Sequence, residues 1–260
     1  PVHFAGQPVD LSGIAEQCRR QGATIIEDAA HALGTRTADR RMIGSCHQSA
    51  MTILSFHPVK HITTGEGGAI TTNDAGLAKR LRRLRSHGIT RDPADLSQNP
   101  GPWYYEMREL GWHYRITDLQ CALGESQLRK NERFVQRRRE LHARYCSRLA
   151  GLAGIGLPVE RAGVRSAWHL FVARLDFARF GRTRAEVMGR LRERGIGTQV
   201  HFIPVHLQPY YRQNFGFAPG DFPRAEEMYA QALSLPLCPA MTEADVDRVC
   251  EELTVVLGQQ

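Results

Sequence analysis

The sequence has no apolar run near the roughly 18 residues that a membrane-spanning helix needs, and no signal-peptide pattern opens it. Its six cysteines are scattered without close pairs, which favours reduced thiols over a disulfide framework. It also has no internal repeat and no low-complexity tract. We therefore expect a globular protein of the cytoplasm, with no membrane partner.

The composition is ordinary for a globular protein, with 260 residues, 42% of them hydrophobic and 23% charged. The net charge of +7 is concentrated in two basic runs, 79–85 and 129–139. Nucleic-acid binding is one interpretation of these runs. The other is the solvated face of two helices, since Leu77, Leu81 and Leu84 keep helical spacing beneath the charges. No nucleic-acid recognition motif accompanies the charge, so we favour the second interpretation, and a basic surface also suits an anionic small substrate.

The pattern of elements predicts an α/β protein with a second, smaller domain. We expect residues 1–150 to form the cofactor-binding domain with a long connecting helix, and residues 151–260 to form a small α+β domain. The chain opens inside the α/β alternation, so we expect its beginning to lie elsewhere. The predicted helices are 11–21, 74–86, 117–149, 183–195, 223–233 and 242–257, and the predicted strands are 23–26, 50–54, 69–72, 167–175 and 198–203. Asp74 is expected to cap the second helix, and residues 117–120 fit a capping box that begins the third.

One segment between two predicted strands carries candidate chemistry. Residues 55–68 read Ser-Phe-His-Pro-Val-Lys-His-Ile-Thr-Thr-Gly-Glu-Gly-Gly. Glycines in such a loop let the backbone pass close to a ligand, and a lysine there can act as a nucleophilic amine when burial or neighbours lower its pKa. The alternative is a solvated hairpin in which Lys60 is incidental.

An acidic residue changes the balance between these two interpretations. Asp28 follows the apolar run 23–26, which places it at the carboxyl end of a strand, where open α/β sheets bind their ligands. An acid and a lysine at neighbouring strand ends suggest pyridoxal phosphate (PLP). Lys60 would hold the aldehyde as a Schiff base, and Asp28 would keep the pyridine nitrogen protonated.

These two motifs, in this order, resemble the DegT/DnrJ/EryC1/StrS family of sugar aminotransferases, a branch of the fold-type I PLP enzymes. The resemblance implies an α/β fold in which a truncated large domain with a mixed sheet is joined to a small α+β domain. It runs from Pro1 almost to Gln260, and further motifs carry it at 84–90, 103–106, 199–211 and 234–237.

The resemblance implies roles for four residues of the first half. Lys60 matches the Schiff-base lysine that also shuttles the proton, and related sugar dehydratases carry His there, so Lys favours transamination. Asp28 matches the partner of the pyridinium, His31 a position beside the cofactor ring, and Ser55 a hydroxyl that holds the cofactor phosphate. The structural alternatives are a surface lysine, a helix N-cap, an interior histidine and an ordinary strand-end serine.

Three further positions are less direct matches. His113 stands where most of the family has Asn, which reaches across a dimer interface to the partner's cofactor phosphate; an imidazole could donate one such hydrogen bond, or be a packed surface residue. His206 and Tyr210 match a segment that lines the sugar end of the site, although a structural aromatic turn is an alternative. The histidine pairs 57/61 and 201/206 lack Cys or Glu at ligand spacing, so we expect no metal.

For function, the resemblance implies PLP-dependent transfer of an amino group to C4 of a UDP-linked 4-keto-6-deoxy sugar, in nucleotide-sugar biosynthesis of the pseudaminic acid type. The donor would be L-glutamate and the assembly a homodimer. The alternatives are a sibling aminotransferase for a different nucleotide sugar, and a non-catalytic fragment. Relatives begin upstream of Pro1 with a phosphate-binding turn and a ring that stacks on the pyridine. We therefore expect these residues alone to bind PLP weakly and to leave apolar sheet surface uncovered.

Overall fold

The computed structural model describes residues 1–259. Its chain divides into two compact units, one made of Pro1–Phe4 with Pro8–Asn131 and the other of Ala5–Gln7 with Glu132–Gln260. This division by contacts falls before the Gly- and Ala-rich segment 150–158, and the functional boundary at residue 150 stays a prediction. Among the described residues, no helix combines the length and the apolar character needed to cross a membrane.

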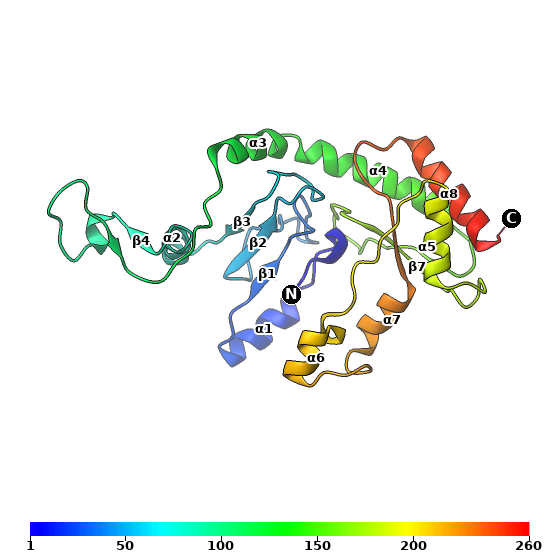
Figure 1. The fold of residues 1–260 in the computed structure, drawn as a ribbon, viewed down its shortest axis with the longest axis horizontal. Coiled ribbons are helices and arrows are strands. Elements are labelled where there is room, and N and C mark those ends of the chain that lie inside the picture. Colours follow the sequence, from blue (N-terminus) through cyan, green and yellow to red (C-terminus); the bar gives the residue numbers. More distant parts are fainter. Residues whose placement is uncertain (260) are drawn as a thin grey trace. The chain divides into compact units, whose positions relative to one another are not determined.

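A mixed three-stranded sheet organises the first unit (Figure 1). It contains β1 (Ile26–Asp28), β2 (Met51–Ser55) and β3 (Gly68–Thr71), in the order β1-β2-β3. β1 runs parallel to β2, and β3 runs antiparallel to β2. Because parallel strands end at the same edge of a sheet, the residues that follow β1 and β2 emerge side by side.

The two faces of this sheet differ in burial. Side chains alternate between the faces along each strand. Glu27, Thr52 and Leu54 are buried on one face, where Leu54 joins a small apolar cluster. The opposite face confirms the expectation of uncovered apolar surface, because three isoleucines there are exposed by 44%, 42% and 47%: Ile26, Ile53 and Ile70.

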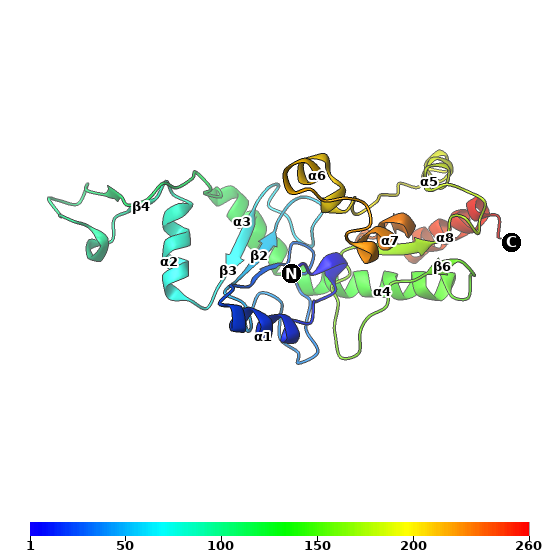
Figure 2. The same ribbon diagram turned by 90° about the horizontal axis from the view of Figure 1, so that it is seen from below.

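The first two helices of this unit form close to where the sequence predicts them. α1 (Ser12–Gln21) ends at Gly22, whose φ of 64° is the left-handed conformation that glycine adopts without strain. α2 (Ala75–Leu84) begins after Asp74, whose carboxylate accepts a 2.9 Å hydrogen bond from the Leu77 N–H. Beyond α2, a hairpin of β4 (Ile89–Thr90) and β5 (Glu106–Met107) projects away from the sheet of this unit (Figures 1 and 2).

The single long helix predicted over 117–149 is wrong. It is two helices, α3 (Asp118–Leu128) and α4 (Asn131–Leu149). At the break, the Lys130 N–H donates to the Gln127 carbonyl at 2.9 Å, an i−3 bond that tightens the last turn of α3 and stops it. Apolar periodicity continues across such a two-residue interruption, so the sequence pattern does not reveal it.

An antiparallel sheet with helices forms the second unit, which confirms the predicted α+β character. Its strands β6 (Ile155–Gly156), β7 (Phe171–Leu175) and β8 (Ala232–Leu235) lie in the order β6-β7-β8. Side chains of β7, β8 and three helices share one core. The helices of this unit are α4, α5 (Arg184–Glu193), α6 (Pro209–Phe215), α7 (Pro223–Gln231) and α8 (Glu243–Leu257).

Two local predictions in this unit are wrong. Residues 198–203 form no strand and make a single bridge, between Gln199 and Ser234. The predicted helix 223–233 ends at Gln231, and the next residues form β8, which is buried at all four positions. The four residues Ala-Leu-Ser-Leu fit a buried strand and a helix end equally well, so periodicity does not separate the two.

The core of the second unit generates a stability prediction. Leu191 on α5 is fully buried in the apolar cluster that includes Leu253 of α8. Leu191→Ala removes buried methyl groups and leaves a cavity, so we expect the free energy of unfolding to fall by about 2–5 kcal/mol in a denaturant titration. The neighbouring exposed Arg192→Ala serves as the control and should change it by less than about 0.5 kcal/mol. Equal effects of the two changes would contradict the assigned core.

Candidate active site

Two of the predicted site residues stand at the same edge of the first unit's sheet. Asp28 is the last residue of β1 and Ser55 the last residue of β2. The parallel register pairs Asp28 with Ile53, so Ser55 lies two residues further along the neighbouring strand. The chain then leaves β2 in the lysine loop, residues 56–67, and returns as β3, where Gly68 pairs with Ser55.

Backbone hydrogen bonds fix the lysine loop internally. The Phe56 N–H donates to the Gly67 carbonyl at 2.9 Å, which closes the base of the loop. The Thr64 N–H donates to the Phe56 carbonyl at 3.0 Å, and the Lys60 N–H donates to the His57 carbonyl at 2.9 Å. Lys60 is therefore carried on a turn with satisfied backbone groups rather than on an open hairpin.

The glycines at the end of the loop are required by close packing. A Cβ on Gly68 would lie 2.6 Å from the Leu54 carbonyl oxygen, and a Cβ on Gly67 would lie 2.3 Å from Thr64 Oγ1. Gly67 also has a φ of 156°, which L side chains rarely adopt. These contacts explain why both positions are glycine. The surrounding atoms leave no room for a side chain, as the sequence suggested for a loop in which the chain packs closely.

A side chain from α3 also holds the lysine loop. Thr117 and Gln120 form the predicted capping box, in which Gln120 Oε1 accepts from the Thr117 N–H at 3.1 Å. The amide nitrogen of the same Gln120 donates to the Glu66 carbonyl at 3.0 Å. The sequence predicts the cap but not this second contact, because a capping motif carries no information about what its free amide reaches.

The surroundings of Lys60 oppose its protonation. The side chain is half-buried, and this burial lowers the pKa of the Lys60 ammonium below its ordinary value. Attraction to the Asp28 carboxylate offsets part of the shift. The lysine loop leaves the sheet at the edge where Asp28 lies, and the joint role of the two residues stays a prediction.

The turn after β1 places the remaining residues of the acidic motif. The Asp28 side chain is exposed, and its Oδ1 accepts a hydrogen bond from the Ala30 N–H at 3.0 Å. His31 is buried, with its ring 6.0 Å from the ring of Phe4. Its burial agrees with an interior position, and its role beside a cofactor ring stays a prediction.

Ser55 and its neighbour His57 lie at the start of the lysine loop. The Ser55 hydroxyl accepts a long hydrogen bond, 3.4 Å, from the His57 N–H. His57 Nε2 is 3.8 Å from the Glu66 carboxylate across the loop, and its Nδ1 accepts from the Val59 N–H at 3.3 Å. The Ser55 hydroxyl hydrogen can still be donated to an anion at this edge.

His113 lies in a different setting from the lysine loop. It is exposed, follows the β4–β5 hairpin and forms a bridge with Ser86 at the end of α2. Its ring meets the ring of His87 edge-on at 5.2 Å, and its Nε2 is 3.0 Å from the Arg115 guanidinium. The group is polar and basic, as an anion contact requires, and its role across an interface stays a prediction.

His206 and Tyr210 belong to the second unit. His206 is buried, donates from Nε2 to the Glu226 carboxylate at 2.9 Å and lies 4.7 Å from the ring of Phe222. The hydrogen bond from His206 lowers the pKa of the Glu226 carboxyl. Tyr210 is exposed at the start of α6, beside Tyr211. This unit therefore holds His206 firmly and presents Tyr210, and their substrate contacts stay predictions.

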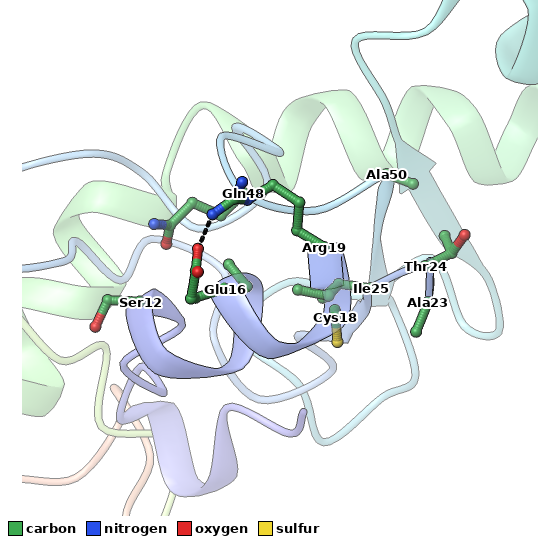
Figure 3. A pocket seen from close by; sticks show the side chains of 10 residues that line it. Ser12, Glu16, Cys18, Arg19, Ala23, Thr24, Ile25, Gln48 and Ala50 are labelled. Carbon is green, nitrogen blue, oxygen red and sulfur yellow. Dashed lines mark hydrogen bonds and ion pairs between the residues drawn. The ribbon is translucent and has the colours of Figure 1, made fainter. Parts of the chain in front are cut away.

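A pocket of about 500 Å³ lies elsewhere in the first unit (Figure 3). It opens between α1 and the residues that precede β1 and β2, and the ion pair of Glu16 with Arg19 lies in its wall. It is at the amino ends of those strands, whereas Asp28 and Ser55 are at their carboxyl ends. Its lining residues are Ser12, Ala15, Glu16, Cys18, Arg19, Ala23, Thr24, Ile25, Gln48 and Ala50.

Fold and site together define the class of protein. A mixed sheet that carries an acid at one strand end and a glycine-rich lysine loop at the next, in a chain that also has an α+β unit, is typical of the fold-type I PLP aminotransferases. The model of the DegT/DnrJ/EryC1/StrS aminotransferase family matches residues 1–254. The chain belongs to this family, which confirms the assignment made from its motifs.

Individual relatives agree with this assignment. The chain is 42% identical over 252 residues to the spore coat polysaccharide biosynthesis protein SpsC of Bacillus subtilis, covering 96% of this chain and 64% of SpsC. Helicobacter pylori PseC, an aminotransferase involved in the biosynthesis of pseudoaminic acid, superposes with a TM-score of 0.88 at 27% identity, over 99% of this chain and 66% of PseC. A Streptococcus pneumoniae protein in its PLP form superposes with a TM-score of 0.85 at 28% identity, over 99% of this chain and 67% of that one. The chain thus spans about two thirds of the length of these relatives.

The chain has three lysines, so the lowered pKa of Lys60 can be measured against an internal control. Hydrogen bonds to Asp92 and Asp95 raise the pKa of Lys79, whose ammonium is 2.8 Å from each carboxylate. A lower pKa means a larger neutral amine fraction at a given pH. In trace acetylation across a pH series, read by peptide mapping, we expect the midpoint for Lys60 to fall below that for Lys79. A midpoint for Lys60 at or above that of Lys79 would contradict the site as described.

Proposed function

We propose that the protein is a PLP-dependent nucleotide-sugar aminotransferase and that Lys60 is its central residue. The observation that carries this is the half-buried Lys60, whose pKa burial lowers, on the loop that leaves the sheet at the edge where Asp28 lies, in a chain of an aminotransferase family. The residues present fit the cofactor: an amine for its aldehyde, an acid for its ring nitrogen and a hydroxyl for its phosphate. The related Streptococcus pneumoniae protein has been solved in a PLP form.

Each residue would contribute a distinct action. When bound, PLP supplies an electron sink for the carbon that carries the amine. Lys60 would hold the cofactor covalently through Nζ and, once displaced, would accept and return a proton there, which a lowered pKa favours. Asp28 would hold the proton on the ring nitrogen, Ser55 would donate to the phosphate, and His31 would hydrogen-bond cofactor or substrate.

For the substrate, we propose a UDP-linked 4-keto-6-deoxy sugar that receives the amino group at C4, with L-glutamate as the donor. The similarity to PseC, which acts in the biosynthesis of pseudoaminic acid, supports a sugar of that type. The net charge of +7 supports an anionic nucleotide-linked substrate over a neutral one. His206 and Tyr210 would contribute to the sugar end of the site.

Borohydride reduction tests the cofactor and the lysine together. After incubation with PLP at a saturating concentration, which offsets weak binding, reduction should fix one cofactor per chain on the peptide that contains Lys60, and Lys60→Ala should lose the label while keeping its fold. The reduced label on Lys79 or Lys130, or no label on the wild type, would refute the assignment. Amino transfer is then measured by mass spectrometry of a UDP-linked 4-keto-6-deoxy sugar supplied with L-glutamate, beside a dTDP-linked analogue as the comparison for nucleotide preference.

In the same assay, Asp28→Asn tests the acid. The change keeps the size of the side chain and removes the charge that would hold the ring nitrogen protonated. We expect cofactor to remain bound and the rate of amino transfer to fall by orders of magnitude. A rate near that of the wild type would exclude the role given to Asp28.

We also propose that two copies associate through the aromatic hairpin, defined as residues 103–114. Its β5 belongs to the hairpin that projects beyond α2 in both views (Figures 1 and 2), and its later residues are hydrogen-bonded to the end of α2, as from the Trp112 N–H to the Leu84 carbonyl at 2.8 Å. Large apolar side chains are exposed along it, including Trp103 by 69%, Leu110 by 80% and Tyr114 by 71%. Exposed apolar surface of this density is typical of an interface. His113 and Arg115, at its end, would then supply donors to the partner's cofactor phosphate.

Two charges placed on the aromatic hairpin test the association. Leu110→Glu with Tyr114→Glu should raise the dissociation constant of the dimer roughly a hundredfold or more, because each buried unpaired charge costs several kcal/mol. Sedimentation across a concentration series measures it. Val159→Glu, at an apolar position that is 78% exposed and outside the hairpin, is the control and should leave the constant unchanged. An unaltered dimer in the double variant would place the interface elsewhere.

A further inference from the structure

A buried histidine and a buried glutamate form a pair next to Asp28. The glutamate, Glu27, precedes Asp28 in β1, and its side chain lies on the buried face of the sheet. His3 is fully buried, and its Nε2 lies 2.7 Å from Glu27 Oε2. Its Nδ1 accepts a 3.0 Å hydrogen bond from the Val9 N–H, so the ring hydrogen is on Nε2 and is donated to Glu27. Both nitrogens of His3 are therefore satisfied, and the ring has one orientation.

Glu27 is satisfied in the same way from the other side. Its Oε1 accepts from the hydroxyls of Ser49 and Thr52, the latter at 3.0 Å. Burial raises the pKa of the Glu27 carboxyl, but the hydrogen bonds from His3, Ser49 and Thr52 outweigh it and hold the pKa below its ordinary value. The strand thus keeps a buried carboxylate with three donors, an arrangement that is costly unless every partner is in place.

The same segment holds Asp28 through its backbone. The Asp28 N–H donates to the Pro1 carbonyl at 2.9 Å, and the Asp28 carbonyl accepts from the His3 N–H at 2.9 Å. On its other side, Asp28 is paired with Ile53 of β2. The residue is therefore fixed between two neighbouring segments, and the side chain of His3 anchors one of them.

We infer that His3 and Glu27 are positioning residues that fix the direction in which Asp28 presents its carboxylate toward Lys60. Consecutive residues of a strand point to opposite faces, so a locked Glu27 on the buried face sets the backbone orientation from which Asp28 projects on the other. The Asp28 side chain is exposed and is held by the hydrogen bond from the Ala30 N–H rather than by packing, so its direction follows the backbone around it. The inference deepens the proposed function, on which the catalytic importance of Asp28 rests.

The test uses the lysine as a reporter and needs no cofactor. The Asp28 charge raises the pKa of Lys60 against the effect of burial, so a displaced carboxylate should let the acetylation midpoint of Lys60 fall further. Asp28→Asn gives the midpoint with that charge removed. His3→Phe keeps a ring of similar size without the hydrogen bond to Glu27, and we expect it to shift the midpoint toward that of Asp28→Asn. The other titratable groups of the loop, His57, His61 and Glu66, are the same in every variant.

Rescue separates positioning from simple stability. His3→Gln restores an amide donor for Glu27 and should return the midpoint toward the wild type. Hydrogen exchange at the amides of His3 and Asp28 should rise roughly ten- to a hundredfold in His3→Phe, the factor expected for loss of one hydrogen bond to a charged group. Ile43→Ala, a cavity in the apolar cluster of the same unit, is the control: it should lower stability and leave the Lys60 midpoint unchanged.

Each result decides the inference. If His3→Phe does not fold, Thr52→Val replaces it, because valine keeps the shape of threonine and removes one donor to Glu27. A folded variant with a wild-type midpoint for Lys60, or an equal shift in Ile43→Ala, would overturn the inference and leave His3 and Glu27 as structural residues. The acetylation midpoint is measured without PLP, so it is independent of the borohydride labelling. The inference about His3 and Glu27 can therefore fail while Lys60 is still labelled, and it can hold where the labelling fails.

Discussion

The parallel pairing of β1 with β2 is the constraint on which the rest of the site depends. It places the ends of both strands at one edge, so that Asp28 and Ser55 emerge together. The antiparallel return of β3 then fixes both ends of the lysine loop, because Gly68 must pair with Ser55. Where the loop enters β3, the backbone of Gly68 lies so close to the Leu54 carbonyl that a larger side chain has no room.

β1 carries two consecutive carboxylates with opposite surroundings. Glu27 is buried and ionised because three donors converge on it, whereas Asp28 is exposed and acts on Lys60 through space. For Lys60, burial and the charge of Asp28 work in opposite directions, and burial prevails. An amine balanced in this way responds to small displacements of its partner, since Coulomb attraction varies with distance while burial does not change.

Features that depend only on neighbouring residues in the chain could be predicted from the sequence. Helix caps at Asp74 and Thr117 were predicted, because the residues that satisfy the free N–H groups lie within one turn. The lysine loop and Asp28 were found through motif order, and the family comparison confirmed the family to which those motifs point. The break after Leu128 is local, but it leaves the apolar period unchanged and so gives no signal in the pattern. The strand β8 was missed because it depends on a distant partner, β7. The contacts of Glu27 and Gln120 were missed for the same reason, although a Glu inside an apolar strand was a signal that a buried partner was required.

Gln120 has a consequence for how motion spreads through the first unit. The Gln120 side chain caps the first turn of α3 and also donates a hydrogen bond to the Glu66 carbonyl in the lysine loop. Helix ends fray readily, and the free energy of such local opening is far smaller than that of global unfolding. When the first turn of α3 opens, the Glu66 carbonyl loses the Gln120 donor in the same event and keeps only the hydrogen bond from the Thr64 hydroxyl, at 2.6 Å, which lies within the loop. Opening of the helix terminus and motion of the lysine loop are therefore coupled. A contact that stabilises the first turn of α3 also reduces the mobility of the loop that bears Lys60.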